Sequence, residues 1–154
     1  MKEYKFVIGI DPGKHGALGL ISMDRSVGYA EVLDLAQLDQ VVKAIRSLNS
    51  ETTLAVIEKV SASPRMGVTS AFHFGESFGV VQGIMIGLGF DTILSPPRNW
   101  KREMGLSSEK EASLSLARKV FPTMSERLKR KGDADRAEAL LLAEWIRLSA
   151  EGAI

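Results

Sequence analysis

The pattern of apolar runs and turn residues near the N-terminus predicts three short strands. Residues 5–10, 17–23 and 29–35 are dominated by apolar and β-branched side chains, as strands with a buried face are. The stretches DPGKHG and MDRSVG separate the three runs, and clusters of glycine, proline and aspartate mark turns. We therefore expect an antiparallel meander.

The next part of the chain predicts a crossover. Apolar residues recur at helical spacing between Leu38 and Leu48, and the run TLAVIE at residues 53–58 has the composition of a buried strand. A helix between two strands most simply makes the second strand parallel to the first. Beyond it we expect a loop at 61–66, a glycine-bearing helix over 70–90, a short strand at 91–94, a SPPRNW turn and two further helical patterns.

Composition fits one globular domain. The 154 residues are 45% hydrophobic and 25% charged, with no cysteine, which is enough apolar material for a real core. We therefore expect a single α/β domain over residues 1–154. The lack of cysteine and of a secretory leader pattern predicts a cytoplasmic protein. The formal net charge is only +1, so the distribution of cations matters more than their sum.

The segment at residues 70–90 is apolar enough to raise the question of a membrane span. It contains His73, Glu76 and Gln82, which argue against contact with lipid, and we expect no membrane association. Its glycines recur every four residues along one side of the helix, at Gly75, Gly79, Gly83 and Gly87. Each costs about 0.5–1 kcal/mol relative to alanine, so another backbone should pack closely there. That backbone belongs either to the sheet of the same chain or to a second subunit.

Two acids end strands that should be neighbours. Asp11 follows one apolar run and Glu58 ends another, and parallel central strands deliver such residues to the same edge, where open α/β sheets place their sites. A carboxylate at the end of a buried strand costs on the order of several kcal/mol unless a partner or a cation compensates it. Taken alone, each acid also fits a strand-end cap or half of a salt bridge.

A second pair of acids lies on the predicted helix at residues 132–148. At 100° per residue, Asp135 and Glu138 fall inside its apolar arc. The opposite side carries Arg136, Glu144 and Arg147. The helix dipole favours acids in the first turn but does not explain why these two point inward. Asp133 has a separate role as the N-cap, with its side chain accepting backbone N–H groups, and is left out of the ligand set.

The four acids together predict a metal site. Carboxylates that meet at one point repel one another unless divalent cations lie among them. Oxygen ligands suit Mg²⁺ or Mn²⁺, whereas His15 and His73 are a weak ligand set for zinc.

Five segments of the chain carry a resemblance to a known family. They are GIDPGKHGA, VIEKV, MGVTSAFHFGESFG, PPRNWKREMGL and DADRAEALLLAEW. Their order resembles that in RuvC-like Holliday junction resolvases, most closely the phage and organellar branch, and the match spans residues 6–145. The resemblance implies an RNase H-like fold, with a five-stranded mixed sheet flanked by helices. For a phage-encoded member it also implies action in the host cytoplasm.

The resemblance also implies an activity and its residues. The family comprises homodimeric, Mg²⁺-dependent endodeoxyribonucleases that cut four-way DNA junctions by symmetric nicks, with two metal ions per active site and Mn²⁺ as a substitute. Metal ligands and catalytic residues would be Asp11, Glu58, Asp135 and Glu138. Asp11 would bridge the two ions, and bacterial relatives carry aspartate where this chain has Glu138. Lys101 and Lys110 resemble the family's basic residues near the scissile phosphate.

Contacts to DNA and to a second subunit follow in part from the resemblance and in part from charge. Clustered cations favour phosphate binding, although a solvated basic surface is the alternative for the run RLKRK. The expected DNA-binding residues are Lys14, Lys59, Arg65, Met66, Arg98, Lys101, Arg102, Lys110, Lys129, Arg130 and Lys131, with Met66 in the place of the bacterial aromatic wedge. The expected dimer interface comprises Phe74, Gly75, Phe78, Gly79, Gln82 and Gly83. Trp100 and Trp145 are expected in the core.

Three other functions compete with this interpretation. Actin-like and sugar-kinase ATPases use a similar turn after a first strand, but they need two domains to enclose a nucleotide. A non-catalytic junction-binding module would gain DNA affinity by losing the acids. An RNase H-fold nuclease acting on RNA, on an RNA–DNA hybrid or on other branched DNA would share the metal chemistry.

Overall fold

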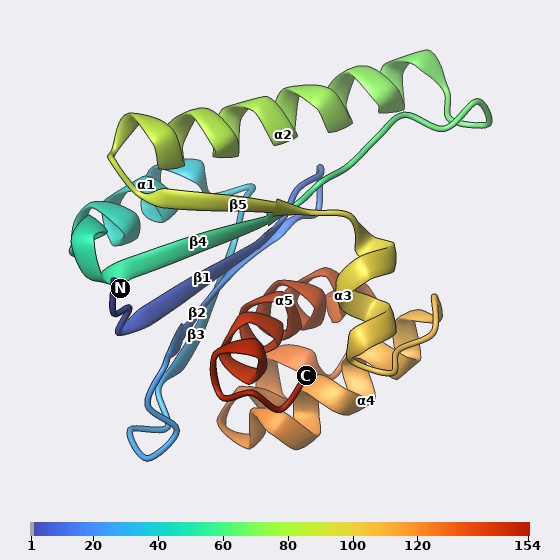
Figure 1. Cartoon of the computed structure of the whole chain (residues 1–154). Helices are drawn as coiled ribbons and strands as arrows, with labels where there is room; N and C mark the ends of the chain where they lie inside the picture. Colours follow the sequence, from blue (N-terminus) through green and yellow to red (C-terminus); the bar gives the residue numbers. More distant parts are fainter. Residues whose placement is uncertain (1) are drawn as a thin grey trace.

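The computed structural model describes residues 2–154 as a five-stranded sheet with helices on both faces (Figure 1). The elements are β1 (Phe6–Asp11), β2 (Ala17–Ser22), β3 (Ala30–Asp34), α1 (Leu38–Arg46), β4 (Thr53–Glu58), α2 (Val68–Gly87), β5 (Asp91–Ser95), α3 (Pro97–Glu103), α4 (Lys110–Val120) and α5 (Ala134–Ala150). Short 3-10 helices lie at η1 (Ser50–Thr52), η2 (Pro122–Leu128) and η3 (Lys131–Asp133).

The sheet has the strand order β3-β2-β1-β4-β5. The first three strands pair antiparallel, while β4 lies parallel to β1 and β5 parallel to β4. The expected meander, crossover and five-stranded mixed sheet are therefore confirmed. The register pairs Ile10 of β1 with Ile57 of β4, so Asp11 and Glu58 follow at the ends of adjacent parallel strands.

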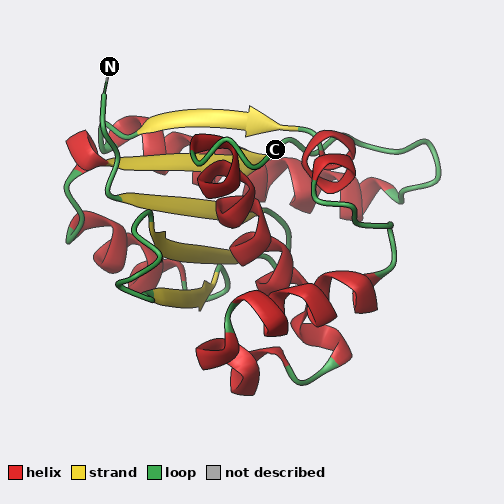
Figure 2. Ribbon diagram, turned by 60° about the horizontal axis from the view of Figure 1, so that its bottom comes forward, coloured by secondary structure: helices red, strands yellow, loops and turns green. Residues whose placement is uncertain are grey.

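Alternate residues of the central strands face two separate apolar layers. Val7 and Val56 point to the side covered by α5 and α4, whereas Ile8 and Ile57 point to the side covered by α1 and α2. Figures 1 and 2 show α5 running across one face of the sheet, with α2 on the opposite face. Strands buried on both faces explain why β1 and β4 lack the polar alternation of surface strands.

Two strand glycines let α5 lie directly on the sheet backbone. A Cβ atom added at Gly9 would come within 2.1 Å of the Ala139 carbonyl oxygen, and one at Gly19 within 2.9 Å of the Leu140 Cα atom. Glycine is therefore required at both positions by close approach of the helix. This contact fixes α5 over β1 and brings its first turn to the end of that strand.

Helix α2 is held by few contacts within the chain. Only Val81 and Met85 are buried among its 20 residues. A Cβ atom added at any of the four regularly spaced glycines would meet no other atom within 4 Å. Packing of this stripe on the sheet of the same chain, one of the two alternatives above, is therefore wrong. None of the helices in residues 2–154 is both long and apolar enough to cross a membrane.

The sequence interpretation was wrong at three local points. The SPPRNW stretch does not form a turn, because Pro97 occupies the first turn of α3, where its missing N–H costs nothing. Glu144 and Arg147 are buried against the end of β2. They pair with each other, Arg25 also pairs with Glu144, and Arg147 donates to the Ser22 carbonyl oxygen. Asp133 precedes α5, but its side chain accepts from the Arg130 backbone N–H and the Arg136 guanidinium rather than from a backbone N–H of α5.

The close approach of α5 to β1 predicts that one methyl group added at Gly9 strongly destabilises the folded protein. Gly9→Ala should lower the free energy of unfolding by about 1–3 kcal/mol or more, as overpacking of a tight core does, because its Cβ would overlap the Ala139 carbonyl oxygen. Gly67→Ala is the matched control, because its added methyl meets open space. Urea denaturation followed by circular dichroism measures both. Equal stability of the two variants would contradict this packing.

Candidate active site

The four acids chosen from the sequence line one cavity of about 540 Å³. Asp11 and Glu58 reach it from the ends of β1 and β4, and Asp135 and Glu138 reach it from the first two turns of α5. Single carboxylate oxygens of Asp11, Asp135 and Glu138 all lie within 4.8 Å of one another. Glu58 lines the same cavity but lies outside this tight group.

Burial makes the cluster electrostatically unfavourable on its own. Asp11, Glu58 and Glu138 are buried. Burial raises the pKa of Asp11 well above its ordinary value, and the negative charges of Glu58, Asp135 and Glu138 raise it further. Burial also raises the pKa of Glu58, although a hydrogen bond from Trp100 opposes this effect. The cluster therefore gains from any positive charge placed within it.

Two lysines supply positive charge to Glu138. Lys101 Nζ lies 2.7 Å from Glu138 Oε1, and Lys110 Nζ lies 3.2 Å from Oε2. The Ser113 hydroxyl donates to Oε1 over 3.3 Å, and Lys110 Nζ lies 3.8 Å from an oxygen of Asp135. Partial burial acts to lower the pKa of Lys110, but the Glu138 carboxylate outweighs it and the pKa is raised. Lys110 is thus held charged beside the acids.

The donor set fits a hard divalent cation. It consists of carboxylate oxygens from two strands and a helix, close enough for one ion to reach three of them, and the chain has no cysteine. Mg²⁺, Mn²⁺ and Ca²⁺ prefer such oxygen ligands. A cation would also remove the mutual repulsion that raises the pKa of Asp11.

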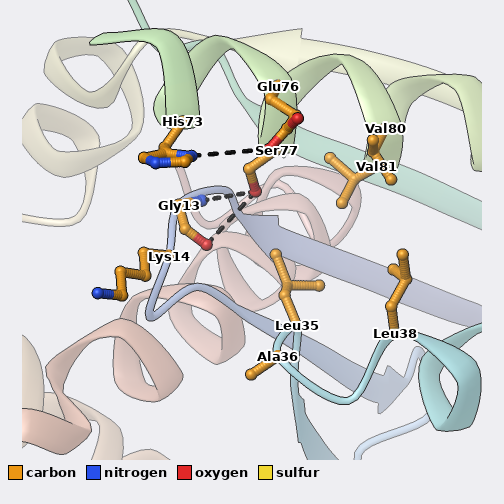
Figure 3. A pocket seen from close by; sticks show the side chains of 10 residues that line it. All are labelled: Gly13, Lys14, Leu35, Ala36, Leu38, His73, Glu76, Ser77, Val80 and Val81. Carbon is orange, nitrogen blue, oxygen red and sulfur yellow. Dashed lines mark hydrogen bonds and ion pairs between the residues drawn. The ribbon is translucent and has the colours of Figure 1, made fainter. Parts of the chain in front are cut away.

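The loop after Asp11 is held by helix α2. The Gly13 N–H donates to Ser77 Oγ over 2.9 Å, and Gly13 has a φ of 137°, a conformation open to glycine. Figure 3 shows this contact beneath α2, next to the His73–Glu76 pair. It lies in a second cavity of about 500 Å³, whose apolar side is formed by Leu35, Ala36, Leu38, Val80 and Val81. Helix α2 therefore touches the loop that carries Lys14.

The residues expected to bind DNA are spread around the carboxyl edge of the sheet. Lys14 is in the loop after β1, and Lys59, Arg65 and Met66 are in the segment between β4 and α2, which projects beyond the sheet in Figure 1. Of the remaining cations, Arg98, Lys101 and Arg102 lie in α3 and Lys110 begins α4. Lys129, Arg130 and Lys131 come shortly before α5. All of them are exposed except Lys101 and Met66, which are partly buried.

Sequence reasoning missed three groups at the site. Trp100 is in the core as expected, but its indole N–H also donates to Glu58 Oε2 over 2.8 Å. Ser113 contacts Glu138, and its position one helical turn after Lys110 was an available signal. Ser77 supports the Gly13 loop, and nothing in its local sequence pointed to that contact. The signal for Trp100 was its place directly before Lys101.

The raised pKa of Asp11 predicts how stability depends on pH. Its folded-state pKa lies above the unfolded value of about 3.8, so its contribution to stability is present at low pH and is lost as the pH rises through the folded pKa. With EDTA present, Asp11→Asn should therefore be more stable than the wild type at pH 8, and this gain should vanish near pH 4. Thermal unfolding across this range measures it. Asp24→Asn, at an exposed acid with a lowered pKa, should show no gain; a similar gain there would contradict the explanation.

Among proteins of known sequence, one relative matches part of the chain. No protein-family model matches the chain. It is 39% identical over 84 residues to the chloroplastic Holliday junction resolvase MOC1 of Chlamydomonas reinhardtii, and these residues are 53% of this chain and 10% of that protein. The chain therefore spans only a small part of this relative's length.

Solved structures match nearly the whole chain. Thermus thermophilus RuvC in complex with a Holliday junction substrate superposes with a TM-score of 0.67 and 17% identity over 96% of both chains. The fowlpox virus Holliday junction resolvase gives a TM-score of 0.54 and 15% identity over 94% of this chain and 99% of that one. The resemblance to RuvC is therefore confirmed at the level of the fold, and the chain has the expected RNase H-like fold.

Proposed function

We propose that this protein is a metal-dependent endonuclease that resolves four-way DNA junctions by paired, symmetric nicks. The observation that carries the proposal is the cluster of Asp11, Asp135 and Glu138, whose oxygens lie within 4.8 Å of one another at the carboxyl edge of the sheet. The cluster occurs in a RuvC-like fold. A relative of 39% identity over 84 residues is named as a Holliday junction resolvase, which supports the same function.

The acids are proposed to hold two Mg²⁺ ions, with Mn²⁺ as a substitute. Asp11 would contact both ions, and Glu58, Asp135 and Glu138 would complete the ligand set. Bound Mg²⁺ supplies activation of a water and stabilisation of negative charge on the departing oxygen. Hydrolysis would leave 5′-phosphate and 3′-hydroxyl ends.

The two lysines are proposed to act on the phosphate. In the described structure they neutralise Glu138, a role that a cation in the cluster would take over. Lys101 and Lys110 would then be free to stabilise the charge that develops on the scissile phosphate. Their position on α3 and at the start of α4 keeps both within reach of the cavity.

The exposed cations around the carboxyl edge are proposed to bind the phosphates of the junction arms. Phosphate contacts give affinity through release of counterions and hold the DNA in register. This role is assigned to Lys14, Lys59, Arg65, Arg98, Arg102, Lys129, Arg130 and Lys131. Met66, in the loop that projects after β4, is proposed to insert at the centre of the junction.

A homodimer formed through α2 is proposed to place two sites on one junction. Val68 is 89% exposed, Phe72 66% and Ile86 61%, and so large an apolar surface on one helix indicates a protein interface. The glycine stripe lies open on the same helix and would let two such helices approach closely. The proposed contacts are Phe74, Gly75, Phe78, Gly79, Gln82 and Gly83. A two-fold axis then explains symmetric nicking.

The protein is also proposed to act in the cytoplasm. The cysteine-free chain fits that reducing compartment.

Cleavage assays separate this function from its rivals. With Mg²⁺, the wild type should nick a four-way junction in two opposed strands and leave linear duplex and an RNA–DNA hybrid intact, because only the junction matches the paired sites. Asp11→Asn should abolish cleavage but not junction binding, and Lys101→Ala should slow cleavage about 10²–10³-fold. Denaturing gels of end-labelled strands measure all of these. Cleavage of the hybrid but not the junction would contradict the proposal.

The proposed dimer predicts a variant that folds but does not assemble. Gly79→Leu adds bulk at the open stripe, and leucine is better than glycine in a helix by about 0.5–1 kcal/mol, so the fold should persist while the dimer dissociates. Ser115→Leu, at an exposed position of α4 on the other side of the sheet, is the control. Sedimentation velocity should give a monomer for the first variant and a dimer for the second. A dimeric Gly79→Leu protein would rule out this interface.

A further inference from the structure

The Trp100 side chain joins the apolar core to the acidic cluster. It is fully buried, at 0% exposure, in the cluster that includes Leu114 and Leu141. Its indole Nε1 donates to Glu58 Oε2 over 2.8 Å. Protein cores are close-packed, so the side chains around this ring restrict its orientation. The direction of the N–H group is therefore set by the core and not by the site.

This hydrogen bond determines how Glu58 can be used. An indole N–H is a donor only and does not titrate. It can therefore donate to a Glu58 oxygen at any pH, and it cannot accept a proton from the carboxyl group. It occupies Oε2, and no other hydrogen bond to Glu58 is made by side chains within residues 2–154. Since Glu58 lines the cavity, the carboxylate is held in one orientation with Oε1 left for another partner.

Helix α3 makes a second contact with the cluster through the adjacent residue. Lys101 Nζ lies 2.7 Å from Glu138 Oε1 and 5.5 Å from the centre of the Trp100 ring. One turn of α3 thus contacts an acid of β4 and an acid of α5. No other pair of adjacent residues in the described chain makes hydrogen bonds from its side chains to both Glu58 and Glu138.

We propose that Trp100 is a positioning residue whose indole N–H orients Glu58 for metal binding and thereby sets the affinity of the site for Mg²⁺ or Mn²⁺. Partners that orient a ligand from the next layer out typically change metal affinity 10–100-fold when removed. This inference rests on the proposed metal-dependent function and assigns Trp100 a role that core packing alone does not require.

The test compares two matched substitutions. Trp100→Phe keeps an aromatic ring but removes the N–H group, and it should weaken Mn²⁺ binding about 10–100-fold, measured by electron paramagnetic resonance of free Mn²⁺. Trp145→Phe is the control, because its indole donates to Glu103 at the surface, and it should leave Mn²⁺ affinity unchanged. In a Glu58→Gln background, Trp100→Phe should cause no further loss. Unchanged affinity in Trp100→Phe, or an equal loss in both single variants, would overturn the inference.

A second measurement leaves Trp100 in place, so its result does not depend on whether the Trp100→Phe variant folds. The chain has two tryptophans, so Trp145→Phe leaves a single indole signal, that of Trp100, in a ¹⁵N-labelled spectrum. This signal should shift during Mg²⁺ titration with the same midpoint as metal binding. A signal that stays fixed while metal binds would overturn the role of Trp100 alone. A wild type that binds neither Mg²⁺ nor Mn²⁺ would overturn the proposed function, and this inference with it.

Discussion

Mutual repulsion among buried carboxylates is the constraint around which the site of this protein is organised. Asp11, Glu58 and Glu138 are all buried at one edge of the sheet, and each would be more stable in water than beside the others. The chain answers with two lysines on Glu138 and an indole N–H on Glu58. These groups reduce the repulsion without removing it, because the pKa of Asp11 stays raised. The remaining repulsion lowers the stability of the folded protein, and a bound cation would relieve it.

The fold creates this arrangement by bringing two backbones into contact. Gly9 and Gly19 allow α5 to lie against β1 and β2, and this single packing contact places acids separated by more than a hundred residues in one cavity. Helix α3 then closes the site from the side, because the buried Trp100 fixes it to the core and Lys101 extends from the next position. Helix α2 touches the loop after Asp11 through Ser77. The helix proposed to form the dimer thus contacts the loop beside the first acid.

Sequence periodicity was sufficient for the sheet and for the choice of acids, because both depend on local signals. Apolar runs ending in Asp11 and Glu58, and an inward angle for Asp135 and Glu138, required no knowledge of distant contacts. The failures concern residues whose environment is made by remote elements. Glu144 and Arg147 appeared to lie on a charged face, but the end of β2 and the turn after it meet that face, where Ser22 and Arg25 contact the buried ion pair. Ser77 and Trp100 acquired polar roles only because folding placed Gly13 and Glu58 beside them.

We propose that the acidic cluster is a metal site and that Lys101 and Lys110 balance its Glu138 carboxylate until a cation binds. The most direct measurement is a crystal structure of the wild type soaked in Mn²⁺, with an anomalous-difference map calculated at the manganese edge. The account predicts two peaks among Asp11, Glu58, Asp135 and Glu138, with Lys101 and Lys110 displaced from the Glu138 carboxylate. An empty cluster at saturating Mn²⁺, with both lysines still bound to Glu138, would contradict it.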